Sequence, residues 1–403
     1  MRILFLSPRQ CWPSRSGAKL REYHFLRALA VSADVTYVHF TEPGAPPLTP
    51  RDLPFCRDVV AVPRPPAYGV GKMLQGLVGR WPLPVLNYAS AEMTAAVRRL
   101  TDSAAFDLIH LDAVHMVPYG EALLGRAPVR MVVNWHNIES EAMRRYSATV
   151  ASPARRWYSA HTAAKWEQLE RDILRTAFGH VVCSPRERDM LQRIAPQARI
   201  AVVGNGVDLE YFAGQGAGSA AARDLVFVGS MDYFPNVEAA SAFSRQIWPR
   251  VRERMPDARL WIVGASPGPA VRALAELPGV RVTGTVPDVR PYYRDALAAI
   301  VPLRTGGGTR LKILEAMAAG VPVISTPLGA EGLDVTPGGD ILIAPPDDAA
   351  AWVGHLLALA DSASAQRPAL VAAALHLART HYDWEALGRT LRETYQGWLR
   401  VGG

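Results

Sequence analysis

The sequence predicts an α/β protein with two parallel-sheet domains. Short apolar runs with strand character alternate with helical patterns along the 403 residues. This length exceeds one ordinary hydrophobic core and fits two domains of about 200 residues each. The clearest unit is residues 300–327, where a strand, a glycine-rich turn, a helix and a second strand follow one another. Because such units build parallel sheets, we expect an α/β fold in each half of the chain.

The first half contains apolar runs that we expect to form one seven-stranded sheet. The first run, residues 2–6, leads through a loop with Gly17 into a helix over about 18–31. A loop in this place lines the crevice at the carboxyl ends of parallel strands. A long helix is expected over about 153–176. The other strand-like runs are residues 35–38, 58–62, 106–112, 129–135, 181–183 and 200–203.

The second half begins after a turn signal at Asn205-Gly206, which we interpret as a hinge. Strand-like runs follow at residues 225–230, 260–263 and 280–283, and Gly264 and Gly284 come directly after the last two. The final helix is expected over about 384–400. We therefore predict an N-terminal domain of residues 1–203, a C-terminal domain of residues 204–380 and a terminal segment of residues 381–403.

The glycine-rich turn of residues 306–309 predicts an anion site. Glycines leave backbone N–H groups open to a phosphate, and the helix that follows presents the positive end of its dipole there. On a helical wheel, Gly308, Lys312 and Glu315 fall within about 60° of one another. A Walker phosphate loop is excluded, because no Gly-Lys-Ser/Thr follows. One face thus offers open backbone, a cation and a carboxylate, which suits a sugar nucleotide.

Composition excludes several other classes of protein. Cys11, Cys56 and Cys183 are scattered without disulfide or zinc spacing, so a reducing, cytoplasmic compartment is expected. The N-terminal apolar run is too short for a signal peptide, and no run approaches 18 apolar residues. No Asp-x-Asp triplet occurs, so no metal is expected to hold a diphosphate.

Charge is unevenly shared along the chain. Residues 1–200 hold 26 Lys and Arg against 17 Asp and Glu, and the remainder holds 18 against 20. This balance indicates either an anionic partner or membrane surface for the N-terminal domain, or simply an arginine-rich solvated surface. For the mixed apolar and basic stretch 68–88 we consider three alternatives: it lies on a membrane interface, it lines an acceptor groove, or it packs on its own domain. No nucleic-acid motif is present.

The segment GGGTRLKILEAMAAGVPVIST, from Gly306 to Thr326, resembles the donor-site signature of family-4 type retaining glycosyltransferases. The resemblance implies two Rossmann-like domains facing across a cleft, the glycosyltransferase B fold, with the acceptor on the first domain and the nucleotide sugar on the second. The final helix then crosses back to the first domain. Glu315 would hold ribose hydroxyls. Gly307 replaces a glutamate common in the family, as in a Gly-Gly-x-Arg-x-Lys sub-group that includes exopolysaccharide-associated sugar transferases.

The same resemblance implies roles for other residues. His136 would contact the donor sugar or polarise the reacting centre, although a structural histidine that caps a helix is the alternative. Many relatives carry an arginine and a lysine after the strand at residues 225–230, where this chain does not, so the cationic role shifts to Lys312 and then Arg310. The expected donor contacts are Gly17, Asn205, Gly229, Ser230, Gly264, Thr285, Val286, Gly306, Gly307, Gly308 and Thr309.

These expectations combine into one functional prediction. The chain is expected to move a sugar with retention from a UDP- or GDP-sugar to a saccharide or lipid-linked acceptor in bacterial polysaccharide or glycolipid assembly. Neither a cofactor nor a metal is expected, and peripheral contact with the inner face of the plasma membrane is a further expectation. The alternatives are a sugar-nucleotide epimerase of the same fold and a non-catalytic nucleotide-binding partner of another transferase.

Overall fold

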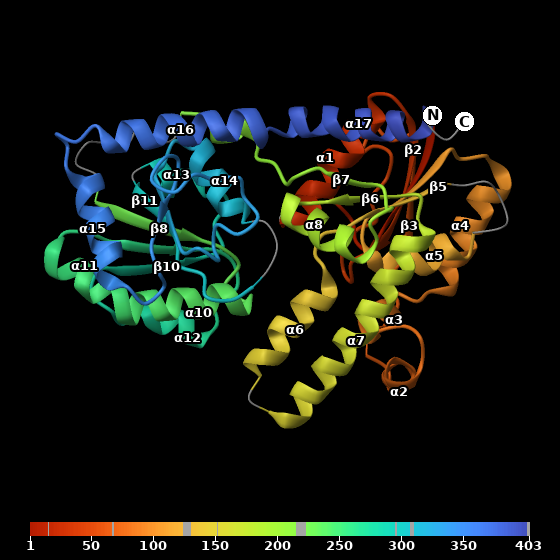
Figure 1. Ribbon diagram of the computed structural model, residues 1–403, viewed down its shortest axis with the longest axis horizontal. Coiled ribbons are helices and arrows are strands. Elements are labelled where there is room, and N and C mark those ends of the chain that lie inside the picture. Colours follow the sequence, from red (N-terminus) through yellow and green to blue (C-terminus); the bar gives the residue numbers. More distant parts are fainter. Residues whose placement is uncertain are drawn as a thin grey trace. The chain divides into compact units, whose positions relative to one another are not determined.

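The computed structural model describes residues 1–14, 16–66, 68–123, 130–150, 152–214, 223–294, 296–306 and 310–400. The chain divides into two compact units, each with its own sheet (Figure 1). The first unit is Met1–Asn205 together with residues from Leu387 on, and the second is Gly206–Ala386. Both sheets are parallel throughout, so the predicted α/β class with two parallel sheets is confirmed.

The sheet of the first unit has seven strands among the described residues, in the order β3-β2-β1-β4-β5-β6-β7. Ile3 in β1 pairs with Val35 on one side and Leu108 on the other, so the strand order reverses between β1 and β4. The strands are β1 (Arg2–Ser7), β2 (Asp34–Thr41), β3 (Asp58–Pro63), β4 (Leu108–Leu111), β5 (Arg130–Asn134), β6 (Gly179–Val182) and β7 (Ile200–Val202).

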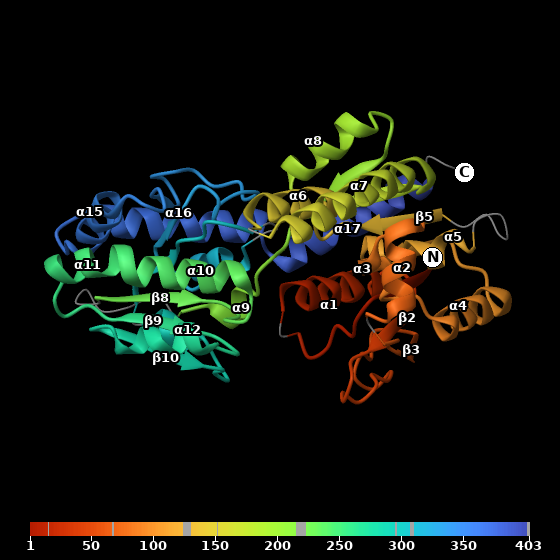
Figure 2. The ribbon, with the colours of Figure 1, turned by 90° about the horizontal axis from the view of Figure 1, so that it is seen from below.

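Helices of the first unit begin at capping residues that the sequence supplies. The side chains of Ser16, Ser90 and Ser184 each accept a hydrogen bond from a backbone N–H three residues further on. The helices are α1 (Gly17–Ala30), α2 (Val70–Val78), α3 (Leu83–Leu86), α4 (Ala91–Ser103), η1 (Val114–Met116), α5 (Val117–Glu121), α6 (Glu139–Thr149), α7 (Pro153–Thr176), α8 (Pro185–Ile194) and α17 (Trp384–Arg400). Helices α6 and α7 lie side by side (Figures 1 and 2).

The sheet of the second unit has six strands in the part of the chain that is described, ordered β10-β9-β8-β11-β12-β13. Its order reverses between β8 and β11, as it does between β1 and β4 in the first unit. The strands are β8 (Asp224–Val228), β9 (Leu260–Val263), β10 (Val280–Gly284), β11 (Ala296–Val301), β12 (Val323–Ser325) and β13 (Leu342–Ile343).

Large aromatic side chains fill the core beside this second sheet. Trp248 and Trp352 are fully buried, and Phe243 meets Trp352 edge to face with ring centres 5.1 Å apart. The helices are α9 (Leu209–Phe212), α10 (Phe234–Ala242), the π-helical turn η2 (Phe243–Ile247), α11 (Trp248–Arg254), α12 (Pro269–Arg272), η3 (Ala273–Glu276), α13 (Arg290–Arg294), α14 (Leu311–Ala318), α15 (Ala349–Ala360) and α16 (Gln366–His381). Among all described residues, no helix has both the length and the apolar character needed to span a membrane.

Helix α14 follows the glycine-rich turn as expected, one residue shorter at each end than the sequence predicted. Arg310 is its N-terminal capping residue. Its C-terminus is fixed by Gly320, whose φ of +73° is readily adopted only by glycine, and by the bond from the Val321 N–H to the Ala316 carbonyl. The helix therefore starts at the carboxyl end of β11, which is the edge where parallel sheets bind ligands.

Candidate functional site

In the second unit, the expected donor residues gather at the reversal of strand order between β8 and β11. Gly229 follows β8, and Lys312 lies in the first turn of α14. The Lys312 ammonium donates a hydrogen bond of 2.8 Å to Asn236 Oδ1 and lies 4.4 Å from the centre of the Phe227 ring. Asn236 is itself held, because its Nδ2 donates to the Ser230 carbonyl at 2.9 Å. The cation is thus fixed at the carboxyl edge of the sheet.

Glycine at position 229 leaves the space that this lysine needs. A Cβ atom added there would lie 2.8 Å from Lys312 Nζ and 2.7 Å from Asn236 Nδ2. Gly264, which follows β9, has a φ of +152°, and a Cβ at that position would lie 1.8 Å from the Gly229 carbonyl oxygen. Backbone geometry therefore requires glycine at position 264, whereas glycine at position 229 leaves room for the ends of the Lys312 and Asn236 side chains.

Burial sets the charges of Lys312 and Glu315, which lie on one side of α14. Burial, and then the nearby Arg310, lower the pKa of Lys312 to about 7, although Glu315 acts in the opposite direction. Burial raises the pKa of Glu315, an effect that Lys312 and then Tyr293 partly offset. Both side chains are only partly exposed. An anion bound here would favour the charged ammonium, so the site is poised for a negatively charged ligand.

Arg310 lies beside Gly306. It is 7% exposed, and its guanidinium nitrogen lies 3.3 Å from the place that a Cβ of Gly306 would occupy. Gly306 has a φ of +104°. Arg310 thus supports the start of the turn and adds positive charge beside Lys312. Gly307, Gly308 and Thr309 lie outside the described residues.

Thr285 and Val286, two of the expected donor contacts, follow β10 at the same edge of the sheet, and β9 lies between β10 and β8. Thr285 is exposed, whereas Val286 packs partly against the core. Gly284 before them has a φ of +73° that turns the chain there. Ser230 is exposed, and its hydroxyl donates to Asp232 Oδ1 at 2.6 Å. These residues follow β8 and β10, strands of the sheet at whose carboxyl edge Lys312 lies.

In the first unit, His136 belongs to a bonded group at the corresponding sheet edge. Its Nε2 lies 3.0 Å from Oδ2 of Asp112, the residue after β4. Asn134, the last residue of β5, donates a 2.6 Å hydrogen bond from Nδ2 to Asp112 Oδ1. Because a carboxylate only accepts hydrogen bonds, His136 Nε2 carries the hydrogen and its Nδ1 is the accepting ring nitrogen. The strand ends thus orient the imidazole.

A buried arginine on α1 holds the same group from behind. Arg21 is fully buried and donates to Asn134 Oδ1 at 2.9 Å, and to the Val203 and Gly204 carbonyls at 2.8 Å each. Its fourth partner is Asn205 Oδ1 at 3.1 Å, so the hinge asparagine is fixed within the first unit. Gly17, expected at the donor phosphate, is the first residue of this same helix.

Two buried acids of this group have opposite protonation states. Burial would raise the pKa of Asp112, but His136 and His110 lower it below the usual range, so Asp112 is ionised. Burial and the Asp112 charge raise the pKa of Glu22, whose carboxyl accepts from Tyr37 at 2.5 Å. Burial, despite Asp112, lowers the pKa of His136. The histidine is therefore neutral at physiological pH, and the charge resides on Asp112.

The sequence did not lead us to place Asp112, Arg21, Asn134 or Asn236 among the donor-site residues. The sequence feature that could have identified Asp112 and Asn134 as site residues is their position at the ends of two strands that are adjacent in the sheet. The feature that could have identified Arg21 is a cationic residue on the apolar face of a predicted helix. No three His, Cys, Asp or Glu side chains come together as metal ligands within the described residues.

Two protein-family models match the chain. One, described as Glycosyltransferase Family 4, matches residues 15–211, and the other, described as Glycosyl transferases group 1, matches residues 222–362. The chain is a glycosyltransferase. The two matches together cover most of both units, and no curated protein matches the sequence.

Solved structures confirm the two-domain B fold of this glycosyltransferase. Sucrose-phosphate synthase from Thermosynechococcus elongatus is 20% identical, with a TM-score of 0.73 and full coverage of both chains. HepE of Anabaena, solved with UDP and glucose, is 15% identical, with a TM-score of 0.68 over 98% of this chain and 99% of that one. WaaG, a glycosyltransferase of lipopolysaccharide biosynthesis, is 14% identical, with a TM-score of 0.62 over 98% and 100%.

Proposed function

We propose that this glycosyltransferase moves a sugar from a UDP- or GDP-sugar to a saccharide or lipid-linked acceptor with retention of anomeric configuration. The observation that carries the proposal is the Lys312 ammonium fixed above Gly229, with Glu315 on the same side of α14. The complex of HepE with UDP and glucose supports a nucleotide-sugar donor, and WaaG supports bacterial glycolipid or polysaccharide assembly as the setting.

The donor would be held by charge and open backbone. Lys312 and the N-terminus of α14 meet the diphosphate, and Arg310 adds a second positive charge beside Gly306. Glu315 accepts hydrogen bonds from the ribose hydroxyls. With two cations at the phosphate, the site neutralises the leaving group through protein groups, so the proposed reaction proceeds without a divalent metal.

The reaction is a front-face substitution. The acceptor hydroxyl oxygen forms a bond to the anomeric carbon as the bond from that carbon to the β-phosphate oxygen breaks. The acceptor proton passes to the departing phosphate oxygen, which gives a glycoside and a nucleoside diphosphate. Lys312 stabilises the charge that grows on this phosphate. His136, neutral and oriented by Asp112, offers a hydrogen-bonding group to the transferred sugar.

A thermal-shift screen with UDP-, GDP- and ADP-sugars in EDTA tests the donor site. A donor at 100 times its dissociation constant should add about 2.7 kcal/mol to the free energy of unfolding. The Glu315→Ala variant should lose this shift, whereas Glu253→Ala, which removes an exposed carboxylate of the second unit, should keep it. A donor shift that requires added Mn²⁺, or that survives Glu315→Ala, would contradict the proposal.

Product analysis tests the chemistry. NMR of the glycoside should show the anomeric configuration of the donor, and an inverted product would reject the front-face mechanism. Incubation without acceptor separates the transferase from an epimerase, because an epimerase converts the donor sugar without any acceptor.

The proposal includes peripheral contact with an anionic membrane. Helix α2 exposes apolar side chains, Val70, Met73, Leu74 and Val78, in a unit whose first 200 residues carry a net positive charge. Co-sedimentation with vesicles should be stronger with phosphatidylglycerol than with phosphatidylcholine, and should weaken in a Met73→Ser, Leu74→Ser variant. Equal binding to both vesicles, or none, would exclude this contact.

A further inference from the structure

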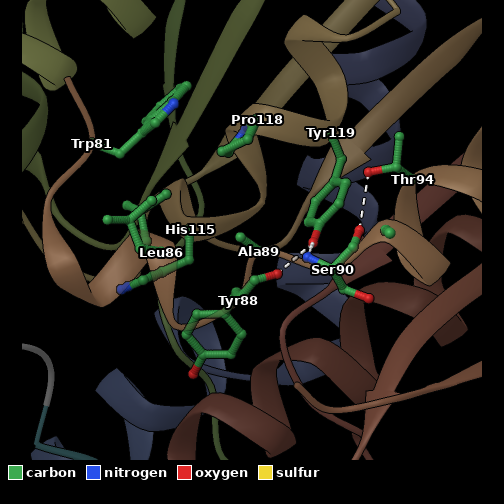
Figure 3. Close-up of a pocket in the computed structure, with 11 residues that line it drawn as sticks. Trp81, Leu86, Tyr88, Ala89, Ser90, Thr94, His115, Pro118 and Tyr119 are labelled. Carbon is green, nitrogen blue, oxygen red and sulfur yellow. Dashed lines mark hydrogen bonds between the residues drawn. The ribbon is translucent and has the colours of Figure 1, made fainter. Parts of the chain in front are cut away.

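A pocket of about 350 Å³ lies in the first unit between the α3–α4 connection and the η1–α5 segment (Figure 3). Its volume is within the usual range for small-molecule sites, about 300 to 1,000 Å³. The lining residues, from 81–94 and 115–119, include no Asp, Glu, Lys or Arg. Aromatic rings of Trp81, Tyr88 and Tyr119 form part of the wall. The lining therefore favours an apolar ligand.

The side-chain hydroxyls of this wall, on Tyr88, Ser90, Thr94 and Tyr119, already have partners. Tyr119 Oη accepts from the Ser90 N–H at 2.9 Å and donates to the Tyr88 carbonyl. Thr94 Oγ1 donates to the Ser90 carbonyl at 3.0 Å, and Ser90 Oγ caps α4 (Figure 3). A saccharide buried here would lose its hydrogen bonds to water and find few replacements, which is costly. A hydrocarbon chain has no such requirement.

His115 connects the pocket wall to the Asp112–His136 edge. It lies three residues after Asp112, in η1, and meets Tyr88 edge to face with ring centres 5.3 Å apart. Burial first, and then the charges of Arg9, His136 and Arg64, lower the pKa of His115 to about 3, so the ring stays neutral. The pocket is thus uncharged and lies beside the carboxyl edge of β4.

A cation lies at the rim. Arg64, which follows β3, is exposed, and its guanidinium stacks 4.8 Å from the centre of the Tyr88 ring and donates to Tyr88 Oη at 3.2 Å. A positive charge next to an apolar pocket matches a molecule with a hydrocarbon chain and a phosphate. Gly76 of α2 packs on Leu83 of α3, and Val85 and Leu86 of α3 line the pocket, so α2 with its exposed apolar side chains adjoins the pocket wall.

We propose that this pocket binds the hydrocarbon chain of a lipid-phosphate-linked acceptor, with its phosphate near Arg64 and its sugar toward the Asp112–His136 edge. The inference rests on the proposed function, since it names the class of acceptor that the transferase uses. According to this inference the pocket takes part in acceptor recognition, so that the enzyme selects its acceptor by the lipid as well as by the sugar.

Calorimetric titration of the full chain with two isoprenoid phosphates tests this pocket. Geranyl phosphate should bind between a hundredfold and roughly a thousandfold more tightly than dimethylallyl phosphate, because five additional carbons are buried at up to about 0.8 kcal/mol each. Ala89→Phe places a ring at an exposed residue of the lining and should weaken geranyl phosphate about tenfold or more by filling the space. Ala95→Phe makes the same change at an exposed residue of α4 outside the lining, and should bind as wild type does.

Several results would overturn the inference. One is equal affinity for the two phosphates, and another is unchanged geranyl phosphate binding in Ala89→Phe. A third is loss of chain-dependent binding in Met73→Ser, Leu74→Ser with retention in Ala89→Phe, which would put the chain on the surface of α2. Binding of maltotriose that Ala89→Phe abolishes would make the pocket a sugar site. The thermal shifts with nucleotide sugars test the proposed function independently of the pocket. If wild type showed no such shift, the proposed function would be rejected, whereas binding that depends on chain length would still support a lipid site.

Discussion

The two sheet edges of this glycosyltransferase have the same topology and opposite chemistry. In the first unit, the reversal between β1 and β4 holds an ionised acid, a neutral histidine, an amide and a buried guanidinium that bond to one another. In the second unit, the reversal between β8 and β11 holds glycines and one partly exposed lysine whose pKa is lowered. The named groups of the first edge are oriented by bonds to one another, whereas at the second edge burial and Arg310 outweigh Glu315 and lower the pKa of Lys312.

This difference shows how the same parallel-sheet edge can either orient a side chain in advance or bind an anion. A bonded network keeps His136 in one orientation before any ligand arrives, at the cost of burying charge. Open backbone beside a partly neutral cation gives a site that becomes favourable only when an anion enters. We therefore expect mutations at the first edge to act mainly on stability, and cation mutations at the second edge to act mainly on donor binding and rate.

The largest expected effect is at the packed glycines of the second edge. Gly264→Ala forces a Cβ against the Gly229 carbonyl oxygen, 1.8 Å away, and should lower the free energy of unfolding by on the order of 4 kcal/mol or prevent folding. Gly284→Ala is the matched control, because Gly284 also has a positive φ but nothing lies within 4 Å of its added Cβ. Its cost should be about 1–2 kcal/mol. Equal costs for the two variants, measured by urea unfolding, would contradict this packing.

Next in size is the loss of the cation. Lys312→Ala removes a charge that the leaving phosphate needs and should reduce the transfer rate roughly a hundredfold, about 3 kcal/mol in the barrier. The fold should be kept, since burial disfavours the charged lysine in the free protein. Arg304→Ala removes a cation from the connection after β11, where it pairs with Asp347, and should transfer at nearly the wild-type rate. Comparable losses in both variants would mean that net charge, and not the position of Lys312, matters.

A smaller effect is expected at the first edge, where two acids can be compared directly. Asp112→Asn puts an amide donor opposite Asn134 or His136, both of which donate, and should cost about 2 kcal/mol of stability. Glu22→Gln should cost little, because the raised pKa of Glu22 keeps it protonated in the folded chain. As pH rises above the usual value of 4.5, unfolded Glu22 ionises and wild type loses stability relative to this variant. Urea unfolding at pH 5 and pH 7 measures the stability of both variants and the pH dependence of wild type. If Glu22→Gln were less stable than Asp112→Asn, the assignment of the negative charge to Asp112 would be reversed.

The sequence was most informative where the signals are local. The helices at 153–176 and 384–400 have the bounds expected from it, and the first of them begins at a proline, a residue favoured in the first turn of a helix. The unit at residues 300–327 was recognisable because glycine turn, helix and strand are contiguous. Strand ends differ by up to three residues from those expected, as at β2, which runs to Thr41 and not to residue 38, since pairing with neighbouring strands, and not propensity, decides where a strand stops.

The long-range contacts could not be predicted from the sequence. Nothing near Gly229 shows that Lys312 will occupy the space beside it, and nothing near Arg21 shows that it will bond Asn205. Such pairs depend on how the strands are ordered in the sheet. The sequence did predict that Lys312 and Glu315 share one side of a helix, because that relation spans only three residues. The assignments of His136, Thr285 and Val286 to the donor, like metal independence, stay predictions.

The measurement that tests the central claim most directly is proton uptake on donor binding. UDP-glucose and GDP-mannose are titrated calorimetrically in EDTA at pH 6 and pH 8, in buffers with different ionisation enthalpies. Because the pKa of Lys312 is lowered to about 7, the free side chain is mostly neutral at pH 8, and a bound diphosphate should draw close to one proton, but almost none at pH 6. Lys312→Met should take up none at either pH. Tight binding at pH 8 without proton uptake, or equal uptake by Lys312→Met, would contradict the account that this lysine holds the diphosphate.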